Sequence, residues 1–126
     1  MANEDKKSGT VNGFRDAYKK AVTELLILRL LRDRDMYAYE MQREIQRQSG
    51  GVLTFNTLYL AIYRLKDFGF IQERSKRTVD GRERVYFGIT EDGGRRYWEL
   101  TEEYRRLTEA TESILMGKDG DSNDGN

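Results

Sequence analysis

Apolar side chains recur at helical spacing along most of the chain, beginning with a segment of unusually broad apolar surface. Residues 14–32 carry Tyr18 and Leu25 followed by a run of leucines, and these positions cover more than one face of a helix. A helix that is apolar on so many sides must be covered from two directions. The pattern predicts a central helix over residues 14–32, ended by the acidic corner that contains Asp33 and Asp35.

A second amphipathic segment follows this corner. Met41 and Ile45 lie four residues apart, with polar side chains between them, and predict a helix over residues 37–48. Gly50 and Gly51 supply the stop, because glycine readily adopts the conformation that ends a helix.

The third predicted helix begins after Thr54, a residue type that caps helix N-termini, and ends at Gly69, a type that caps C-termini. One face of this helix is apolar, and the opposite face combines hydrogen-bonding and stacking groups. The outward positions are Asn56, Tyr59, Leu60, Tyr63 and Asp67, with Arg64 at the flank. Such a face suits a binding partner better than it suits plain solvent.

Beyond Gly69 the chain changes to strand-like patterns. Residues 70–78 and 82–89 flank Asp80 and Gly81, a dipeptide that strongly favours hairpin turns. We therefore predict an antiparallel β-hairpin after the third helix.

The charges of this hairpin suggest its register. A two-residue turn would place Arg77 directly opposite Arg84, an unfavourable like-charge pair, whereas a three-residue loop over residues 79–81 pairs Arg77 with Glu83. We predict the three-residue loop, which also gathers the apolar strand residues on one face. The opposite face is then a basic stripe of Arg74, Lys76, Thr78, Arg82 and Arg84.

The last predicted helix follows Thr90 and extends to about Met116. Its apolar positions have the alternating three- and four-residue spacing of a heptad seam. The seam comprises Tyr97, Leu100, Tyr104, Leu107, Thr111 and Ile114. We expect no later element to cover a helix of roughly 37 Å, so a second copy of the chain is the expected cover. Folding back onto its own domain is the alternative.

Composition limits the chemistry that these elements can carry. The 126 residues include no cysteine, histidine or proline, which excludes zinc fingers, disulfides, thiol nucleophiles and imidazole catalysis. Only 37% of the residues are hydrophobic and 35% are charged, so the core is small and association is expected to add stability. We predict a protein that binds rather than catalyses, with no cofactor and no metal site.

The net charge of zero conceals an asymmetry along the chain. Residues 54–84 contain seven basic and four acidic side chains, a net charge of +3, whereas residues 85–112 contain four basic and seven acidic ones, a net charge of −3. A basic middle segment followed by an acidic helix predicts that the middle segment binds an anionic partner.

Neither a signal peptide nor a membrane span is predicted. Residues 1–13 carry Glu4 and Asp5 rather than a basic start with an apolar run. The longest apolar block, residues 25–31, is interrupted by Arg29 and is far shorter than the roughly 20 residues of a membrane span. We expect a cytoplasmic protein.

Three helices followed by a basic hairpin is the element order of a winged helix-turn-helix, in which the third helix enters the major groove and the hairpin contacts the backbone or minor groove. The predicted fold class is mainly α with a small β-hairpin, plus a long C-terminal dimerisation helix. We expect a disordered arm over residues 1–13, a DNA-binding domain over 14–90, a dimerisation helix over 91–116 and a disordered tail over 117–126.

The sequence also resembles a known family. The resemblance is carried by three segments in order between residues 23 and 93: ELLILRLLRDRDMYAYEMQREIQ, TLYLAIYRLKDFGFI and GRERVYFGITEDG. Their content and spacing are similar to those of the PadR family of bacterial transcriptional regulators. The single C-terminal helix is similar to the small subgroup of that family.

Four positions depart from the family's usual pattern. Ala38 stands in place of a glycine, Leu60 and Glu83 in place of prolines, and Val85 in place of a basic residue. Leu60 lies on the outward face of the third helix, where it either touches a thymine methyl or loosens the helix geometry. Glu83 places a negative charge near DNA unless Arg77 neutralises it.

The resemblance implies a homodimeric repressor whose two recognition helices read a pseudo-palindromic operator in double-stranded DNA. It implies dimerisation through the first and last helices. Tyr39 and Tyr59 are as consistent with packing in the core as with contacting DNA. Asn56 and Arg64 have side chains that favour base contacts. The implied DNA contacts are Asn56, Thr57, Tyr59, Tyr63 and Arg64 on the recognition helix, Lys76, Arg77, Arg82 and Arg84 on the wing, and Tyr37 and Tyr39 as phosphate donors.

Some family members with short last helices resemble multidrug sensors, in which aromatic side chains of both subunits sandwich a planar small molecule. Aligned through ITEDG, that aromatic position falls at Tyr104, with Trp98 one residue off the seam. Dimer packing is the simpler explanation for both residues, and an effector pocket is the alternative.

Two other functions compete with a DNA-binding transcriptional regulator. A winged-helix adaptor would bind proteins through the third helix, but it has no need of a basic stripe. An enzyme would need paired carboxylates in a cleft, and the pair of Asp33 with Asp35 is better explained as a helix terminus.

Overall fold

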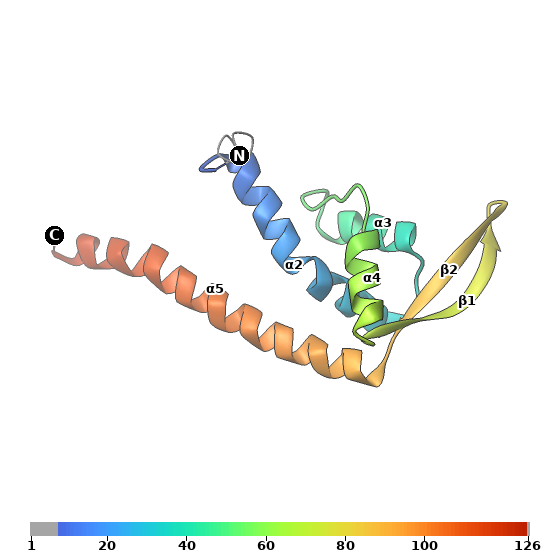
Figure 1. Cartoon of the computed structure of the whole chain (residues 1–126). Helices are drawn as coiled ribbons and strands as arrows, with labels where there is room; N and C mark the ends of the chain where they lie inside the picture. The colour runs from blue at the N-terminus through green and yellow to red at the C-terminus, as the bar shows by residue number, and fades with distance from the viewer. Residues whose placement is uncertain (1–7, 126) are drawn as a thin grey trace.

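The computed structural model describes residues 8–125, with side chains over residues 8–117. The elements are α2 (Val11–Asp33), α3 (Ala38–Gln48), α4 (Tyr59–Asp67), β1 (Ile71–Val79), β2 (Arg82–Ile89) and α5 (Glu91–Gly125). The inner half of α2 gathers with α3 and α4, the hairpin projects to one side, and α5 extends in the opposite direction (Figure 1). The predicted fold class, mainly helical with one antiparallel hairpin and a long last helix, is confirmed.

The core lies around the inner half of α2. Ile27 and Leu28 are completely buried there, together with Met41 of α3 and Ile62 of α4. The base of the hairpin closes the same cluster with Phe87. Since α2 packs against α3, α4, α5 and β2, the prediction of a central helix covered from more than one side is confirmed.

The start of α2 differs from the prediction. Thr10 Oγ1 accepts a hydrogen bond from the Gly13 amide at 2.9 Å, which caps the helix so that it begins at Val11. Residues 11–13, assigned to the disordered arm because they carry few apolar side chains, therefore form the first turn. Residues 8–10 of that predicted arm form the turn before the helix, and residues 1–7 lie outside the described residues.

The start of α4 also differs, and Thr54 is not its N-cap. The amide of Gln42 on α3 donates hydrogen bonds to the carbonyl oxygens of Phe55 and Asn56 at 2.8 and 3.1 Å, which hold these residues in a loop. Leu58 is the capping position. The Thr57 hydroxyl accepts a hydrogen bond from the Tyr59 amide at 3.2 Å and is the polar group at the start of the helix.

The C-terminal end of α4 confirms the predicted glycine stop. Gly69 adopts a left-handed conformation with φ of 82°, and its amide bonds to the carbonyl of Lys66 at 2.9 Å. The predicted N-cap of the last helix is confirmed too, because Thr90 Oγ1 accepts a hydrogen bond from the Gly93 amide at 3.0 Å. Thr90 also donates to the Gly69 carbonyl at 2.6 Å, which ties α5 to the end of α4.

The predicted hairpin register is wrong. Val79 pairs with Arg82 and Arg77 pairs with Arg84, so the turn has two residues, Asp80 and Gly81. Both have positive φ, 51° and 78°, as in the turn whose twist matches that of the flanking strands. The like-charge pair is tolerated because each guanidinium stacks on a different aromatic ring, as described below.

This register divides the predicted basic stripe. Because side chains alternate along strands and directly paired residues share a face, Arg77, Arg82 and Arg84 lie together with Tyr86. Opposite them lie Lys76 and Thr78, and Thr78 rather than Arg77 is paired with Glu83. A bulge between Glu73 and Ser75 shifts the alternation, and Arg74 turns back to donate to the Ile89 carbonyl at 2.7 Å.

The last helix is longer than predicted. It continues through residues 117–125, which the sequence analysis assigned to a disordered tail, while Asn126 lies outside the described residues. Extending a helix by one residue costs much less than starting one, so a polar segment can continue a helix that apolar residues began. Among the described residues, no helix combines the length and apolarity that a membrane crossing requires.

Candidate nucleic-acid interface

The outward side of α4 presents an aromatic and aliphatic surface. Tyr59 and Tyr63 are half exposed and stack with ring centroids 5.8 Å apart, and Leu60 is 75% exposed. These three residues, called here the exposed face of α4, point away from the buried Ile62 and Leu65. The predicted outward face is therefore confirmed for these positions, and the alternative that Tyr59 belongs to the core is wrong.

The polar residues predicted to read bases are placed differently. Asn56 and Thr57 belong to the loop before α4 rather than to its first turn. Arg64 lies on the flank toward α2, where its Nε donates to Glu24 Oε2 at 2.8 Å. The guanidinium of Arg64 is thus already engaged by the chain's own carboxylate.

A groove of about 430 Å³ runs between α4 and α2. Thr57, Leu60 and Arg64 line one side, and Lys19 and Lys20 line the other. The Lys19 ammonium lies 5.1 Å from the ring centroid of Phe55. These two lysines were not among the predicted contacts, because the first helix was expected to be purely central. Their adjacent charges between apolar positions were the available signal.

A second groove, of about 260 Å³, separates α4 from the wing, which consists of β1, β2 and their turn. It brings together four predicted tyrosines and one predicted arginine from three elements, and it also contains two carboxylates. Its polar and aromatic lining consists of Tyr37, Tyr39, Tyr59, Tyr63, Glu73, Glu83 and Arg84.

The carboxylates in this groove differ in their environment. Glu73 accepts a hydrogen bond from Lys66 at 2.9 Å, which lowers the pKa of Glu73 and raises the pKa of Lys66. Glu83 forms no ion pair within residues 8–117, and Arg77 lies on the other face of the hairpin. The negative charge of Glu83 is therefore left in the groove.

The arginine–tyrosine stack, formed by Arg77, Tyr86, Tyr37 and Arg84, connects the wing to the start of α3. The Arg77 guanidinium lies 4.1 Å from the ring centroid of Tyr86, and the Arg84 guanidinium lies 5.1 Å from that of Tyr37. The two rings meet edge to face at 5.3 Å. Stacking on rings holds each arginine in a defined orientation while it keeps its charge. Tyr37, predicted as a phosphate donor, thus also positions a wing arginine.

The remaining predicted wing cations are not held in this way. Arg82 is exposed and pairs across the strands with Val79, next to the turn. Lys76 is exposed on the opposite face, across from Val85. Both side chains are in reach of a partner that contacts the end of the wing.

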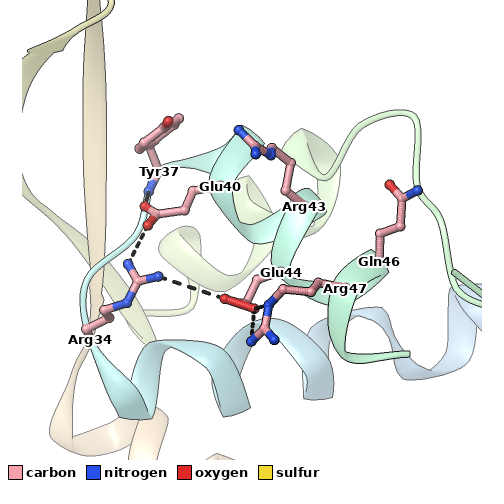
Figure 2. Close-up of a pocket in the computed structure, with 7 residues that line it drawn as sticks. All are labelled: Arg34, Tyr37, Glu40, Arg43, Glu44, Gln46 and Arg47. Carbon is pink, nitrogen blue, oxygen red and sulfur yellow. Dashed lines mark hydrogen bonds and ion pairs between the residues drawn. The ribbon is translucent and has the colours of Figure 1, made fainter. Parts of the chain in front are cut away.

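A cluster on α3, shown in Figure 2, contains several charges that neutralise one another. Arg34 bonds to Glu40 and lies 4.0 Å from Glu44, and Arg47 bonds to Glu44 at 2.6 Å. These contacts raise the pKa of Arg34, chiefly through Glu40, and lower the pKa of Glu44, chiefly through Arg47.

Arg43 extends apart from those paired side chains (Figure 2). It forms no ion pair within residues 8–117 and lies 5.7 Å from the ring centroid of Tyr39, which is half exposed. The alternative that Tyr39 belongs to the core is wrong. Sequence analysis missed Arg43, and the i, i+4 spacing of Tyr39 and Arg43 was the signal for this pair.

The predicted dimer seam on α5 is divided in two. Tyr97 and Leu100 pack against the chain's own core, as the alternative of folding back requires. Farther along, Leu107, Thr111 and Ile114 are exposed, the last with 72% of its surface. Between these halves the hydroxyl groups of Tyr104 and Tyr18 lie 3.4 Å apart, and this hydrogen bond raises the pKa of Tyr18.

The aromatic residues considered for an effector already have partners within the chain. The Arg32 guanidinium lies 4.9 Å from the ring centroids of both Tyr97 and Trp98. Trp98 remains 51% exposed, and Tyr104 is bonded to Tyr18. A flat cation on the same face of Trp98 as Arg32 would have to replace Arg32.

Comparison with known proteins shows to which family this chain belongs. The model of the PadR-like family of transcriptional regulators matches residues 27–100, which include the helix-turn-helix, the wing and the start of α5. The chain belongs to the PadR-like family. Regulators of this family bind DNA and are not enzymes, which agrees with the choice of a binding protein over a catalyst.

Solved structures and a relative agree with this assignment. A transcriptional regulator from Clostridium thermocellum is 25% identical, with a TM-score of 0.72 over 79% of this chain and 98% of the other. A PadR family regulator from Clostridium difficile is 25% identical, with a TM-score of 0.61 over 75% and 98%. An uncharacterized protein of Lysinibacillus sphaericus is 30% identical over 94 residues, which are 73% of this PadR-like chain and 86% of the relative.

Proposed function

We propose that this PadR-like regulator is a homodimeric repressor that reads a pseudo-palindromic operator in cytoplasmic double-stranded DNA. The observation that carries the proposal is the meeting of Tyr59 and Tyr63, on the exposed face of α4, with Arg84 of the wing around one groove. In winged helices these are the elements that enter the major groove and contact the backbone. The contact residues are the predicted ones, with Lys19, Lys20 and Arg43 added as phosphate contacts.

Dimerisation is supported by apolar surface that the chain leaves uncovered. Phe14 on α2 is 76% exposed, and Leu107 and Ile114 on the outer half of α5 are exposed as well. The outer ends of α2 and α5 diverge (Figure 1), so they do not cover one another. In a two-fold dimer, each copy's outer α5 would pack against the same region of its partner.

The effector part of the proposal involves Arg32. A planar cationic molecule binds an aromatic face as a guanidinium does, so it would compete with Arg32 for Trp98. Release of Arg32 at the junction of α2 and α5 would change how the two helices pack. It would therefore change the distance between the two recognition helices of the dimer. Titration of a planar cationic dye while Trp98 fluorescence is followed tests this part, and an unchanged signal contradicts it.

Selection of bound sequences from a random DNA pool tests the proposed function. We expect enrichment of two inverted half-sites whose centres lie about one helical turn, or a multiple of it, apart. Failure to enrich any sequence at low salt would overturn the proposal and favour the protein-binding adaptor.

The oligomeric state provides the matching control. We expect sedimentation equilibrium to give a dimer, and Ile114→Asp to shift it to a monomer because a charge would enter the seam. The substitution Glu112→Gln on the same helix should leave the dimer intact. If the wild-type protein is a monomer, the proposal that it reads a pseudo-palindromic operator as a dimer is contradicted.

A further inference from the structure

The most exposed large apolar side chain on α4 is that of Leu60. Leu60 is 75% exposed at the second residue of the helix, more than Tyr59 or Tyr63 beside it. At about 100° per residue, Leu60 lies between Tyr63 and Arg64 and near the centre of the side that faces away from the core. It makes an aliphatic contact available at the N-terminal turn of the recognition helix.

The two polar side chains predicted to read bases do not belong to the first turn of α4. Arg64, the cation one turn later, bonds to Glu24 at 2.8 Å. Asn56 lies in the loop before the helix, where its backbone carbonyl accepts a hydrogen bond from Gln42. The first turn of α4 therefore offers apolar contact rather than the paired hydrogen bonds by which arginine and asparagine recognise guanine and adenine.

Only one base edge in the major groove carries an apolar group. The C5 methyl of thymine projects there, whereas the other bases present hydrogen-bond donors and acceptors. We propose that Leu60 is a specificity-determining residue that contacts a thymine methyl in each operator half-site. This inference rests on the proposed DNA-binding function and adds the base that the first turn of α4 selects.

Replacing thymidine by deoxyuridine tests the contact, because it removes the methyl and leaves the Watson–Crick edge unchanged. Each thymidine of a selected operator is replaced in turn, at symmetry-related positions of both half-sites. The full-length protein should lose roughly fourfold in affinity per methyl at one position, the effect of removing about one buried methyl group. At the other thymidines its affinity should stay within the error of the measurement.

Protein variants then assign the contact. Leu60→Ala should bind the thymidine and deoxyuridine operators equally, since the partner of the methyl is gone. Leu60→Met should keep the discrimination because it keeps the aliphatic contact, and Tyr63→Phe on the same face should keep it as well. Truncation at so exposed a position is expected to cost little stability, and the wild-type comparison of the two operators does not depend on any variant.

The possible outcomes distinguish the thymine contact from the proposed DNA-binding function. Discrimination by wild type that disappears in Leu60→Ala supports the thymine contact. A selected operator in which no thymine methyl matters, or in which Leu60→Ala retains the discrimination, overturns the contact and leaves DNA binding intact. Failure to select any operator overturns both.

Discussion

The exposed face of α4, through Tyr59 and Tyr63, and the wing border the same groove but hold their side chains in opposite ways. Leu60, Tyr59 and Tyr63 are neutral, and the two tyrosine rings stack on each other. Arg77 and Arg84 are cationic and stack on rings of the same chain. This difference indicates a division of labour in which the wing supplies charge-dependent affinity and α4 supplies sequence preference.

The largest expected effect comes from removing the ring at the centre of the arginine–tyrosine stack. Tyr86 is 9% exposed, contacts Arg77 and meets the Tyr37 ring. Tyr86→Ala should lower the free energy of unfolding by about 3 kcal/mol and weaken DNA binding, because Arg77 loses the ring on which it stacks and Tyr37, which supports Arg84, loses its neighbouring ring. Denaturant unfolding and DNA titration measure the two effects.

A conservative variant distinguishes stacking from hydrogen bonding at this position. Tyr86→Phe keeps the ring and should retain DNA affinity. A loss of affinity in Tyr86→Phe as large as that in Tyr86→Ala would show that the ring contacts do not hold the arginines.

A smaller effect is expected from Arg82, the exposed cation beside the turn. Arg82→Ala should weaken binding to all sequences and reduce the salt slope of log Kd by about one unit. Arg84→Ala should reduce it by a similar amount. Titrations at several salt concentrations check this prediction. An unchanged salt slope would show that these wing arginines do not contact DNA.

The opposite sign is expected for Glu83, which lines the groove and forms no ion pair within residues 8–117. Glu83→Gln should strengthen DNA binding by roughly twofold to threefold at low salt, and the gain should shrink as salt screens the charge. A fall in affinity would contradict the assignment of an unfavourable charge to Glu83.

The smallest effect concerns pH and the Lys66–Glu73 pair. The pKa of Glu73 is lowered in the folded protein, so the pair stabilises the fold above the ordinary pKa of glutamate and loses this contribution as the pH falls through the lowered value. Glu73→Gln should be slightly less stable than wild type at neutral pH and equally stable in strong acid. Thermal unfolding at both pH values measures the difference, and a gap that widens in acid would contradict this sign.

Local signals in the sequence correctly predicted the element order. Gly69 and Thr90 mark helix boundaries through their own backbone and hydroxyl chemistry, which is why these boundaries were predictable. The start of α4 was missed because Gln42, on a different helix, holds residues 55 and 56 in a loop.

The hairpin register was predicted wrongly, and the inner part of the predicted seam packs within the chain, for a related reason. Charge rules for paired strands rejected the two-residue turn, but the rings of Tyr37 and Tyr86 accommodate Arg77 and Arg84. Heptad spacing marks an apolar seam without saying which molecule covers it, and Leu100 packs on the chain's own core. Both features depend on contacts between residues distant in sequence.

Comparison of Arg82→Ala with Leu60→Ala on selected and random DNA, each over a range of salt, tests the division of labour most directly. The account predicts that Arg82→Ala weakens binding to both DNAs with a reduced salt slope and an unchanged specificity ratio. Leu60→Ala should lower the specificity ratio and leave the slope unchanged. Equal changes of slope and ratio in the two variants would contradict it.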